Sequence, residues 1–186
     1  MSNNHNKEYS IFQIAMNLTA ACFISGAIIA VTYLVTTPVA AEKAVMMKND
    51  TMKALVEDAE NFEPIEGKED WFSAQKNGEV IGYVVPAESK GYGGTIKILV
   101  AVSPQGEIID YDILAHNETP GLGDNAGKEP FKSQFKGKTS KDLEVVKDVS
   151  KKNNIQAMTG ATISSKAVTK GIREAVEQVE QFEGGK

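Results

Sequence analysis

Cysteine and histidine are almost absent from this 186-residue chain, which contains one cysteine and two histidines. A disulfide framework, or a zinc site built from Cys and His ligands, needs more of these residues than the chain has. Iron–sulfur clusters are excluded for the same reason, because each is held by about four cysteine thiolates. Any chemistry must therefore come from oxygen-bearing side chains, the backbone or a bound cofactor. We predict no metal ligands and no catalytic residues in the chain itself.

Positive charge is also scarce, since 20 Lys and Arg residues face 25 Asp and Glu residues, for a formal net charge of −5. Nucleic-acid binding is a poor hypothesis, because neutralising phosphates requires a basic surface. The sequence contains no G-x-G-x-x-G after a strand and no G-x-x-x-x-G-K-[ST], so neither a Rossmann site nor a P-loop nucleotide site is supported. The length allows one ordinary domain and a modest extension.

Charged residues are missing from a long stretch near the amino end, between Glu8 and Glu42. Its most apolar part, residues 11–35, would extend about 37 Å as a helix at roughly 1.5 Å per residue. A hydrocarbon core of about 30 Å is shorter than that. We therefore expect a transmembrane helix at 11–35, preceded by a tail at 1–10.

A cleavable signal peptide is the main alternative for this stretch. The small residues Val39, Ala40 and Ala41 precede Glu42 in the pattern that a signal peptidase accepts. Signal peptides have a basic start and an apolar core of about 7 to 15 residues, whereas this run is longer and follows Lys7. A retained anchor is therefore favoured.

The loop charges bear on the orientation of the span. Lys7 precedes it, while Lys43, Lys48 and Lys53 follow it. By the positive-inside rule this distribution faintly favours a cytoplasmic position for the rest of the chain.

One face of the expected span carries polar and small residues, because Gln13, Asn17, Ala21 and Ser25 recur every four positions. Such a face in lipid packs against another helix, which predicts a multi-subunit membrane assembly. The alternative is that Gln13 and Asn17 simply lie near the headgroups.

The remainder of the chain has the pattern of one mixed domain. Residues 36–61 predict a helical connector, which Pro64 must end. Apolar and β-branched runs predict strands at 71–74, 80–85, 96–102 and 108–114. Short turns, including one at Pro86, separate these runs and favour antiparallel hairpins. An amphipathic helix is expected at 164–182, and residues 62–186 are therefore expected to form an α+β domain.

Two glycine-bearing segments do not fit the role of ordinary turns. Residues 116–124 follow the last expected strand and combine Pro120 with Gly121 and Gly123, which restrict the backbone and bring it close to whatever it faces. Residues 159–165 place four hydroxyls around a glycine just before the final helix. Free N–H groups and the helix dipole attract a phosphate at such a place.

Simpler interpretations exist for both segments. Serine and threonine before a helix are commonly caps, and a glycine among them is commonly a turn. His116 has no cysteine or obvious serine partner for nucleophilic catalysis. Glu118 has no second carboxylate for a glycosidase-type acid pair.

The glycine motifs resemble those of a known family. They are the turn Gly91-Tyr92-Gly93-Gly94 with the strand after it, residues 116–123 reading H-N-E-T-P-G-L-G, and residues 159–165 reading T-G-A-T-I-S-S. Their order and spacing are similar to those of the flavin-binding G subunit of the Rnf electron transport complex. A more distant resemblance is to the C subunit of the sodium-translocating NADH:quinone oxidoreductase, which is usually longer.

This resemblance implies a covalent cofactor. In the family, the last threonine of the S/T-G-A-T motif carries FMN through a phosphoester bond that a separate flavin transferase installs, so the implied attachment residue is Thr162. Thr159, Gly160, Ala161 and Ser164 would then surround the phosphate. The implied flavin-contacting loop comprises six consecutive residues: Glu118, Thr119, Pro120, Gly121, Leu122 and Gly123. The family often has Asp three residues before the motif, where this chain has Gln156.

The resemblance also implies a role and a location. The chain would be a single-pass protein of the bacterial cytoplasmic membrane with an extracytoplasmic domain. It would relay electrons for an ion-translocating ferredoxin:NAD oxidoreductase, in contact with the other membrane and redox subunits. The alternatives are the quinone-reductase subunit and a membrane-tethered flavin-binding module outside any such complex.

Overall fold

A computed structural model describes residues 10–146 and 154–185 of the chain. The chain divides into two compact units, Met1–Met47 and Lys48–Lys186, and each is described here by itself. Helix α1 (Ile11–Leu55) forms the described part of the first unit and supplies the first residues of the second.

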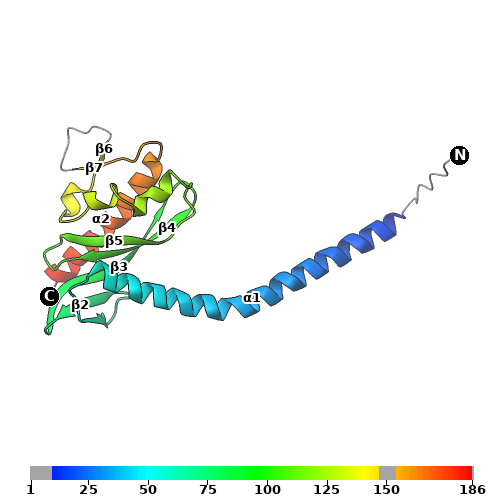
Figure 1. The fold of residues 1–186 in the computed structure, drawn as a ribbon, viewed down its shortest axis with the longest axis horizontal. Coiled ribbons are helices and arrows are strands. Elements are labelled where there is room, and N and C mark those ends of the chain that lie inside the picture. Colours follow the sequence, from blue (N-terminus) through cyan, green and yellow to red (C-terminus); the bar gives the residue numbers. More distant parts are fainter. Residues whose placement is uncertain (1–9, 147–153, 186) are drawn as a thin grey trace. The chain divides into compact units, whose positions relative to one another are not determined.

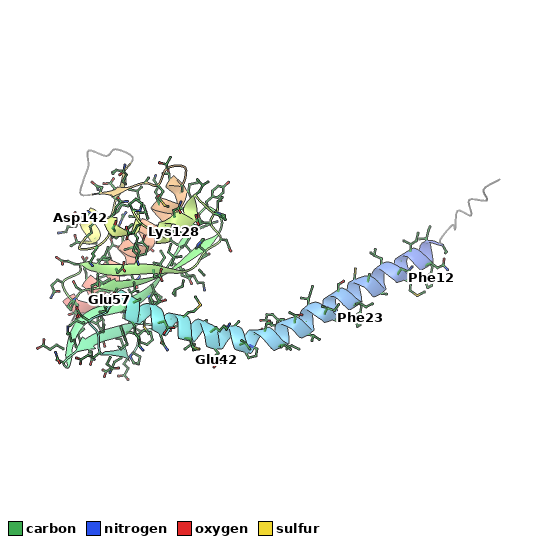
Figure 2. All side chains as sticks on the ribbon, viewed as in Figure 1. Phe12, Phe23, Glu42, Glu57, Lys128 and Asp142 are labelled. Atoms are coloured by element: carbon green, nitrogen blue, oxygen red, sulfur yellow. The ribbon has the colours of Figure 1, made fainter. Side chains whose placement is uncertain are left out.

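The first unit is an apolar helix whose side chains are exposed. Its most apolar 18-residue window has a mean hydropathy of 2.1, and none of that window is buried within the chain. Phe12 and Phe23, labelled in Figure 2, are 72% and 79% exposed. The hydroxyls of Thr32 and Thr36 donate to the carbonyls of Ile28 and Thr32 at 2.8 Å, so these two hydroxyls are satisfied within the helix. The helix is long and apolar enough to cross a membrane.

No break separates the expected span from the expected connector. Helix α1 continues through Pro38 and ends at Leu55, so the last turn of the connector is not helical. The chain then forms a turn and enters the first strand at Asn61, and Pro64 lies at the end of that strand.

The second unit is built on a five-stranded antiparallel sheet (Figure 1). The strands are β1 (Asn61–Pro64), β2 (Phe72–Lys76), β3 (Glu79–Lys90), β4 (Thr95–Val102) and β5 (Ile108–Ala115), paired in chain order. Helix α2 (Thr162–Gly184) packs on one face of this sheet. The α+β class, with antiparallel strands and a carboxy-terminal amphipathic helix, is therefore confirmed.

The central strand β4 shows why the sheet holds the domain together. Its residues alternate between the two faces, and Ile98 and Val100 join the apolar cluster beneath α2. Leu99 and Ala101 face the other way, into a second cluster that includes Leu55 at the end of α1. Both faces of β4 are thus covered from residue 98 onward, and its side chains there are almost wholly buried.

The structure differs from the sequence expectation at several places. A turn was expected at Pro86, but strand β3 continues through this residue. The proline is tolerated because β2 has ended at the Phe72–Val84 pair, so that β3 is bonded there to β4 alone. Strand β1 was not expected. The described residues between β5 and α2 form three short 3₁₀ helices and a parallel strand pair, none of them expected: η1 (Gly123–Gly127), η2 (Lys132–Gln134), η3 (Ser140–Asp142), β6 (Val145–Val146) and β7 (Ile155–Gln156).

Candidate functional site

The two glycine-bearing segments meet at one pocket, beside the amino end of α2. The pocket has a volume of about 480 Å³, which is within the usual range for a small-molecule site. Its walls come from the turn after β3, the loop after β5 and the start of α2. The lining residues are Tyr92, Glu118, Thr119, Leu122, Gly123, Gly160, Ala161, Thr162, Ile163 and Ser164.

The start of α2 leaves donors free for a ligand. The residue before the helix is Ala161, and among the described residues no side chain caps this helix end. The first helical hydrogen bond runs from the Ser165 N–H to the Ala161 carbonyl at 2.9 Å, so the N–H groups of the preceding turn have no acceptor within the helix. The interpretation that the motif hydroxyls serve only as caps is therefore wrong for Thr159 and Thr162.

Gly160 shapes the entry to this helix. Its φ of +76° is in the left-handed region that favours glycine, and a Cβ there would lie 3.2 Å from Leu122. The turn is closed by the Ala161 N–H, which donates to the Met158 carbonyl at 3.2 Å. The Met158 N–H in turn donates to the Ser165 hydroxyl at 3.0 Å, so this serine fixes the motif from inside the helix.

The loop after β5 folds back on itself to form the opposite wall. The Thr119 carbonyl accepts the Leu122 N–H at 3.1 Å, and the Asn125 side chain donates to the Gly121 carbonyl at 3.0 Å. The Tyr111 hydroxyl donates to the buried Ala126 carbonyl, which ties the next turn, η1, to strand β5. The wall is therefore anchored to the sheet.

Glu118 is a buried carboxylate at the centre of the site, 5% exposed. It accepts hydrogen bonds from the backbone N–H groups of Tyr92 and Gly93 and from the Ser164 hydroxyl. Burial raises the pKa of Glu118, but these hydrogen bonds, with the charge of His116, outweigh it and hold the pKa below its usual value. The carboxyl is therefore ionised at neutral pH.

Three side chains at the pocket are apolar although they face solvent. Tyr92 is 72% exposed, Ile163 56% and Leu122 43%. Exposed apolar groups around a polar anchor are typical of ligand sites. The arrangement is able to hold an anionic group at the helix start and a flat apolar group against these side chains.

Most of the residues predicted from the sequence lie at the pocket. Eight of the eleven line it, while Pro120 and Gly121 are exposed nearby and Thr159 does not line it. The prediction missed Tyr92 and Ile163. An aromatic residue flanked by glycines, and an isoleucine outside the apolar stripe of α2, were the signals that could have found them.

Thr159 lines a neighbouring pocket of about 470 Å³, and Leu122 borders both pockets. Gln156 lies on this second pocket with its side chain exposed. The side-chain amide of Gln134 holds the backbone of Gln156, accepting its N–H at 2.7 Å and donating to its carbonyl at 3.3 Å. The position of Gln156 therefore depends on its backbone.

Comparison with known proteins assigns this architecture to a family. A model of the FMN-binding domain matches residues 91–177, which include every residue of the first pocket. The G subunit of the proton-translocating ferredoxin:NAD(+) oxidoreductase complex of Clostridium ljungdahlii is 63% identical over 95% of this chain and 96% of its own length. The G subunit of the Na(+)-translocating complex of Acetobacterium woodii is 31% identical over 90% of each chain.

Solved structures share the fold. The crystal structure of Shewanella oneidensis NqrC superposes with a TM-score of 0.53 and 21% identity, over 70% of this chain and 74% of that one. The C subunit of the Na(+)-translocating NADH-quinone reductase of Parabacteroides distasonis gives a TM-score of 0.51 and 26% identity, over 61% of each chain. The chain, with its FMN-binding domain and apolar amino-terminal helix, belongs to the family of G subunits of the ion-translocating ferredoxin:NAD(+) oxidoreductase complexes.

Proposed function

We propose that this protein is the electron-relay subunit of a membrane complex that couples ferredoxin:NAD oxidoreduction to ion transport. Its family and its FMN-binding domain support this role. The sequence has a single cysteine, which is too few to hold an iron–sulfur cluster, and it has no dinucleotide fingerprint. Both terminal reactions are therefore assigned to other subunits.

The relay group in this proposal is FMN, attached through its phosphate to the hydroxyl of Thr162. The observation that carries it is the position of Thr162, which is the first residue of α2, lines the pocket and does not cap the helix. The N–H groups of the first helical turn favour the negative charge of a phosphate there. The pocket residues thus fit the group at its phosphate end.

The apolar side chains of Tyr92, Leu122 and Ile163 fit the other end of the cofactor. A flavin presents a flat aromatic surface, and an exposed aromatic ring or branched apolar chain binds such a surface by stacking and burial. Bound FMN supplies the transfer of electrons, while the protein sets its position and surroundings. Leu122 and Tyr92 belong to loops that are hydrogen-bonded to the rest of the site, which restricts the movement of a bound ring.

Covalent attachment requires a partner enzyme, for which we propose a flavin transferase. In this step a flavin dinucleotide would be the donor: the Thr162 hydroxyl gives its proton to a base and its oxygen bonds to the FMN phosphorus, while the P–O–P bond breaks and the nucleoside monophosphate leaves with the bonding electrons. Attachment replaces a binding affinity with a permanent local concentration. This matters on the extracytoplasmic side, where no flavin pool is available for rebinding.

We further propose that α1 crosses the cytoplasmic membrane once and that the domain is extracytoplasmic. The length and hydropathy of α1 support a single crossing. The orientation rests on the likeness to the G subunits of the family, against the faint bias of the flanking lysines. Membership of a membrane complex gives the polar stripe on α1 a partner helix.

The relay role is tested on the purified complex. Wild type and Thr162→Val are each coexpressed with the flavin transferase and the other subunits, and the complexes are isolated in mild detergent. We expect both to retain the membrane partners and only the wild type to reduce NAD with ferredoxin. Thr95→Val, at an exposed threonine at the start of β4, is the matched control and keeps wild-type activity.

Two results would contradict the proposal. A wild-type chain that elutes alone, without partner subunits, would show that the protein is not part of such a complex. An active Thr162→Val complex would show that the electron relay does not depend on a cofactor attached to Thr162.

A further inference from the structure

We propose that Glu118 is a positioning residue, which fixes the distance between the walls of the flavin pocket and does not itself bind the flavin. The inference rests on the proposed function, because it concerns how this chain prepares the same pocket. Glu118 lies in the loop that the family resemblance assigns to flavin contact. Its surroundings give it a different task.

Both oxygens of Glu118 are occupied by donors from the protein. Oε1 accepts the Gly93 N–H at 2.8 Å, and Oε2 accepts the Tyr92 N–H at 3.3 Å and the Ser164 hydroxyl. The residue is 5% exposed. A carboxylate so enclosed has little surface left for a ligand atom.

Glycines surround this carboxylate because any side chain would collide with it. A Cβ on Gly91 would lie 2.4 Å from Oε1 of Glu118, and a Cβ on Gly123 would lie 2.7 Å from Oε2. Real Cβ atoms do not approach other atoms so closely. Two glycines of the flavin-family motifs therefore make room for Glu118.

The hydrogen bonds of Glu118 join three segments that are far apart in the sequence. They reach the turn after β3 through Tyr92 and Gly93, and the first turn of α2 through Ser164. Tyr92 is one of the exposed apolar side chains that line the pocket, and Ser164 follows Ile163, which is another. Glu118 thus links the segment that carries Tyr92 to the helix start that carries Ile163, and in this proposal it sets the spacing of the pocket that holds the flavin.

The test compares the protein with and without bound flavin, because a positioning residue acts in both states whereas a flavin ligand acts only when flavin is bound. Glu118→Gln is made in the full-length wild type coexpressed with the flavin transferase, and in Thr162→Val. Glutamine has one acceptor oxygen and an amide that repels the backbone donors. Hydrogen exchange of the Tyr92 and Gly93 amides is measured in both backgrounds, together with the visible circular dichroism of the flavin.

The matched control is Glu180→Gln. Glu180 also accepts from a serine hydroxyl, that of Ser140, at 3.0 and 3.1 Å, but it is exposed and does not line the pocket. We expect Glu118→Gln to accelerate exchange of the two amides about tenfold or more in both backgrounds, and to change the flavin dichroism. The control should alter neither.

Two outcomes count against the proposal. Exchange that rises only in the flavinylated protein would make Glu118 a flavin ligand. Faster exchange with unchanged dichroism would leave it a structural residue without effect on the flavin. A wild type that carries no flavin would refute the proposed attachment to Thr162, not the role of Glu118. In that case the amide exchange measured in Thr162→Val still tests whether Glu118 holds Tyr92 and Gly93.

A second variant keeps the test valid if Glu118→Gln does not fold. Ser164→Ala removes one donor and leaves both backbone hydrogen bonds in place. We expect a smaller change in exchange at Tyr92 and Gly93, and a change in flavin dichroism of the same sign. Unchanged dichroism in Ser164→Ala would refute the link between Glu118 and α2.

Discussion

Gly93→Ala tests how closely the turn after β3 packs on the loop after β5. A Cβ on Gly93 would lie 1.8 Å from the carbonyl oxygen of Asn117, whereas ordinary contact begins at 3.4 Å. The backbone must therefore move by about 3.4 − 1.8 = 1.6 Å. Such a shift breaks the hydrogen bond from the Gly93 N–H to Glu118, which costs about 1.5–3 kcal/mol, and overpacking adds about 1–3 kcal/mol.

The expected loss is therefore about 2.5 to 6 kcal/mol, a large part of a typical domain stability of about 5–15 kcal/mol. Urea unfolding of the full-length protein in detergent measures it through the fluorescence of Trp71, the only tryptophan. Gly184→Ala is the control, because a Cβ there meets nothing within 4 Å, and it should remain within about 1 kcal/mol of wild type. A loss below about 1 kcal/mol for Gly93→Ala would refute the packing argument.

Three further predictions concern the same region. Tyr111→Phe leaves the buried Ala126 carbonyl without its donor and should cost about 1–3 kcal/mol in urea unfolding, whereas an unchanged midpoint would show that this bond contributes nothing. The folded pKa of Glu118 is below its ordinary value of 4.5, so the ionised carboxyl contributes fully to the free energy of unfolding above pH 4.5, and this contribution is lost as the pH falls toward the folded pKa. When unfolding is followed by acid titration, Glu118→Gln should lack this part of the loss of stability. Gly121→Val places a β-branched residue at a φ of +76° and should change the flavin spectrum while the covalent flavin remains; an unchanged spectrum argues against a flavin contact by this loop.

Much of the fold could be predicted because its elements have strong local patterns. The strands from β2 to β5 were predicted from apolar and β-branched runs, and helix α2 from apolar spacing of three to four residues. Short turns joined the strands in order. Pro86 was misjudged because a proline is tolerated where a strand has a neighbour on one side only. The 3₁₀ helices and the β6–β7 pair carry no periodic signal and depend on tertiary contacts.

The site was predictable as a set of residues but not as a geometry. The motifs around Gly121 and Gly160 stood out by composition, and the resemblance to the Rnf flavoprotein family supplied the cofactor. Sequence spacing gave no sign that Glu118 reaches Ser164 and the turn at Gly93, because these contacts join residues 46 and 25 positions apart. The glycines of the first motif were expected only to form a turn, and their close approach to Glu118 gives that turn its physical reason.

The position of Gln156 also became interpretable only with the structure. Its backbone is held by the Gln134 amide, and the residue is exposed at the edge of the second pocket. An aspartate there would leave both hydrogen bonds of the Gln134 amide in place, because they reach only the backbone. Gln156→Asp should leave stability unchanged and should not lower the yield of covalent flavin.

The central claim is that FMN is esterified to Thr162. The most direct test is the mass of the full-length protein and of its Thr162 peptide after coexpression with a flavin transferase, beside Thr162→Val. We expect the wild type to gain the mass of one FMN ester on that peptide and to fluoresce on a denaturing gel, while the variant stays dark. Flavin retained by denatured Thr162→Val, or found on another residue such as Thr159, would contradict the account.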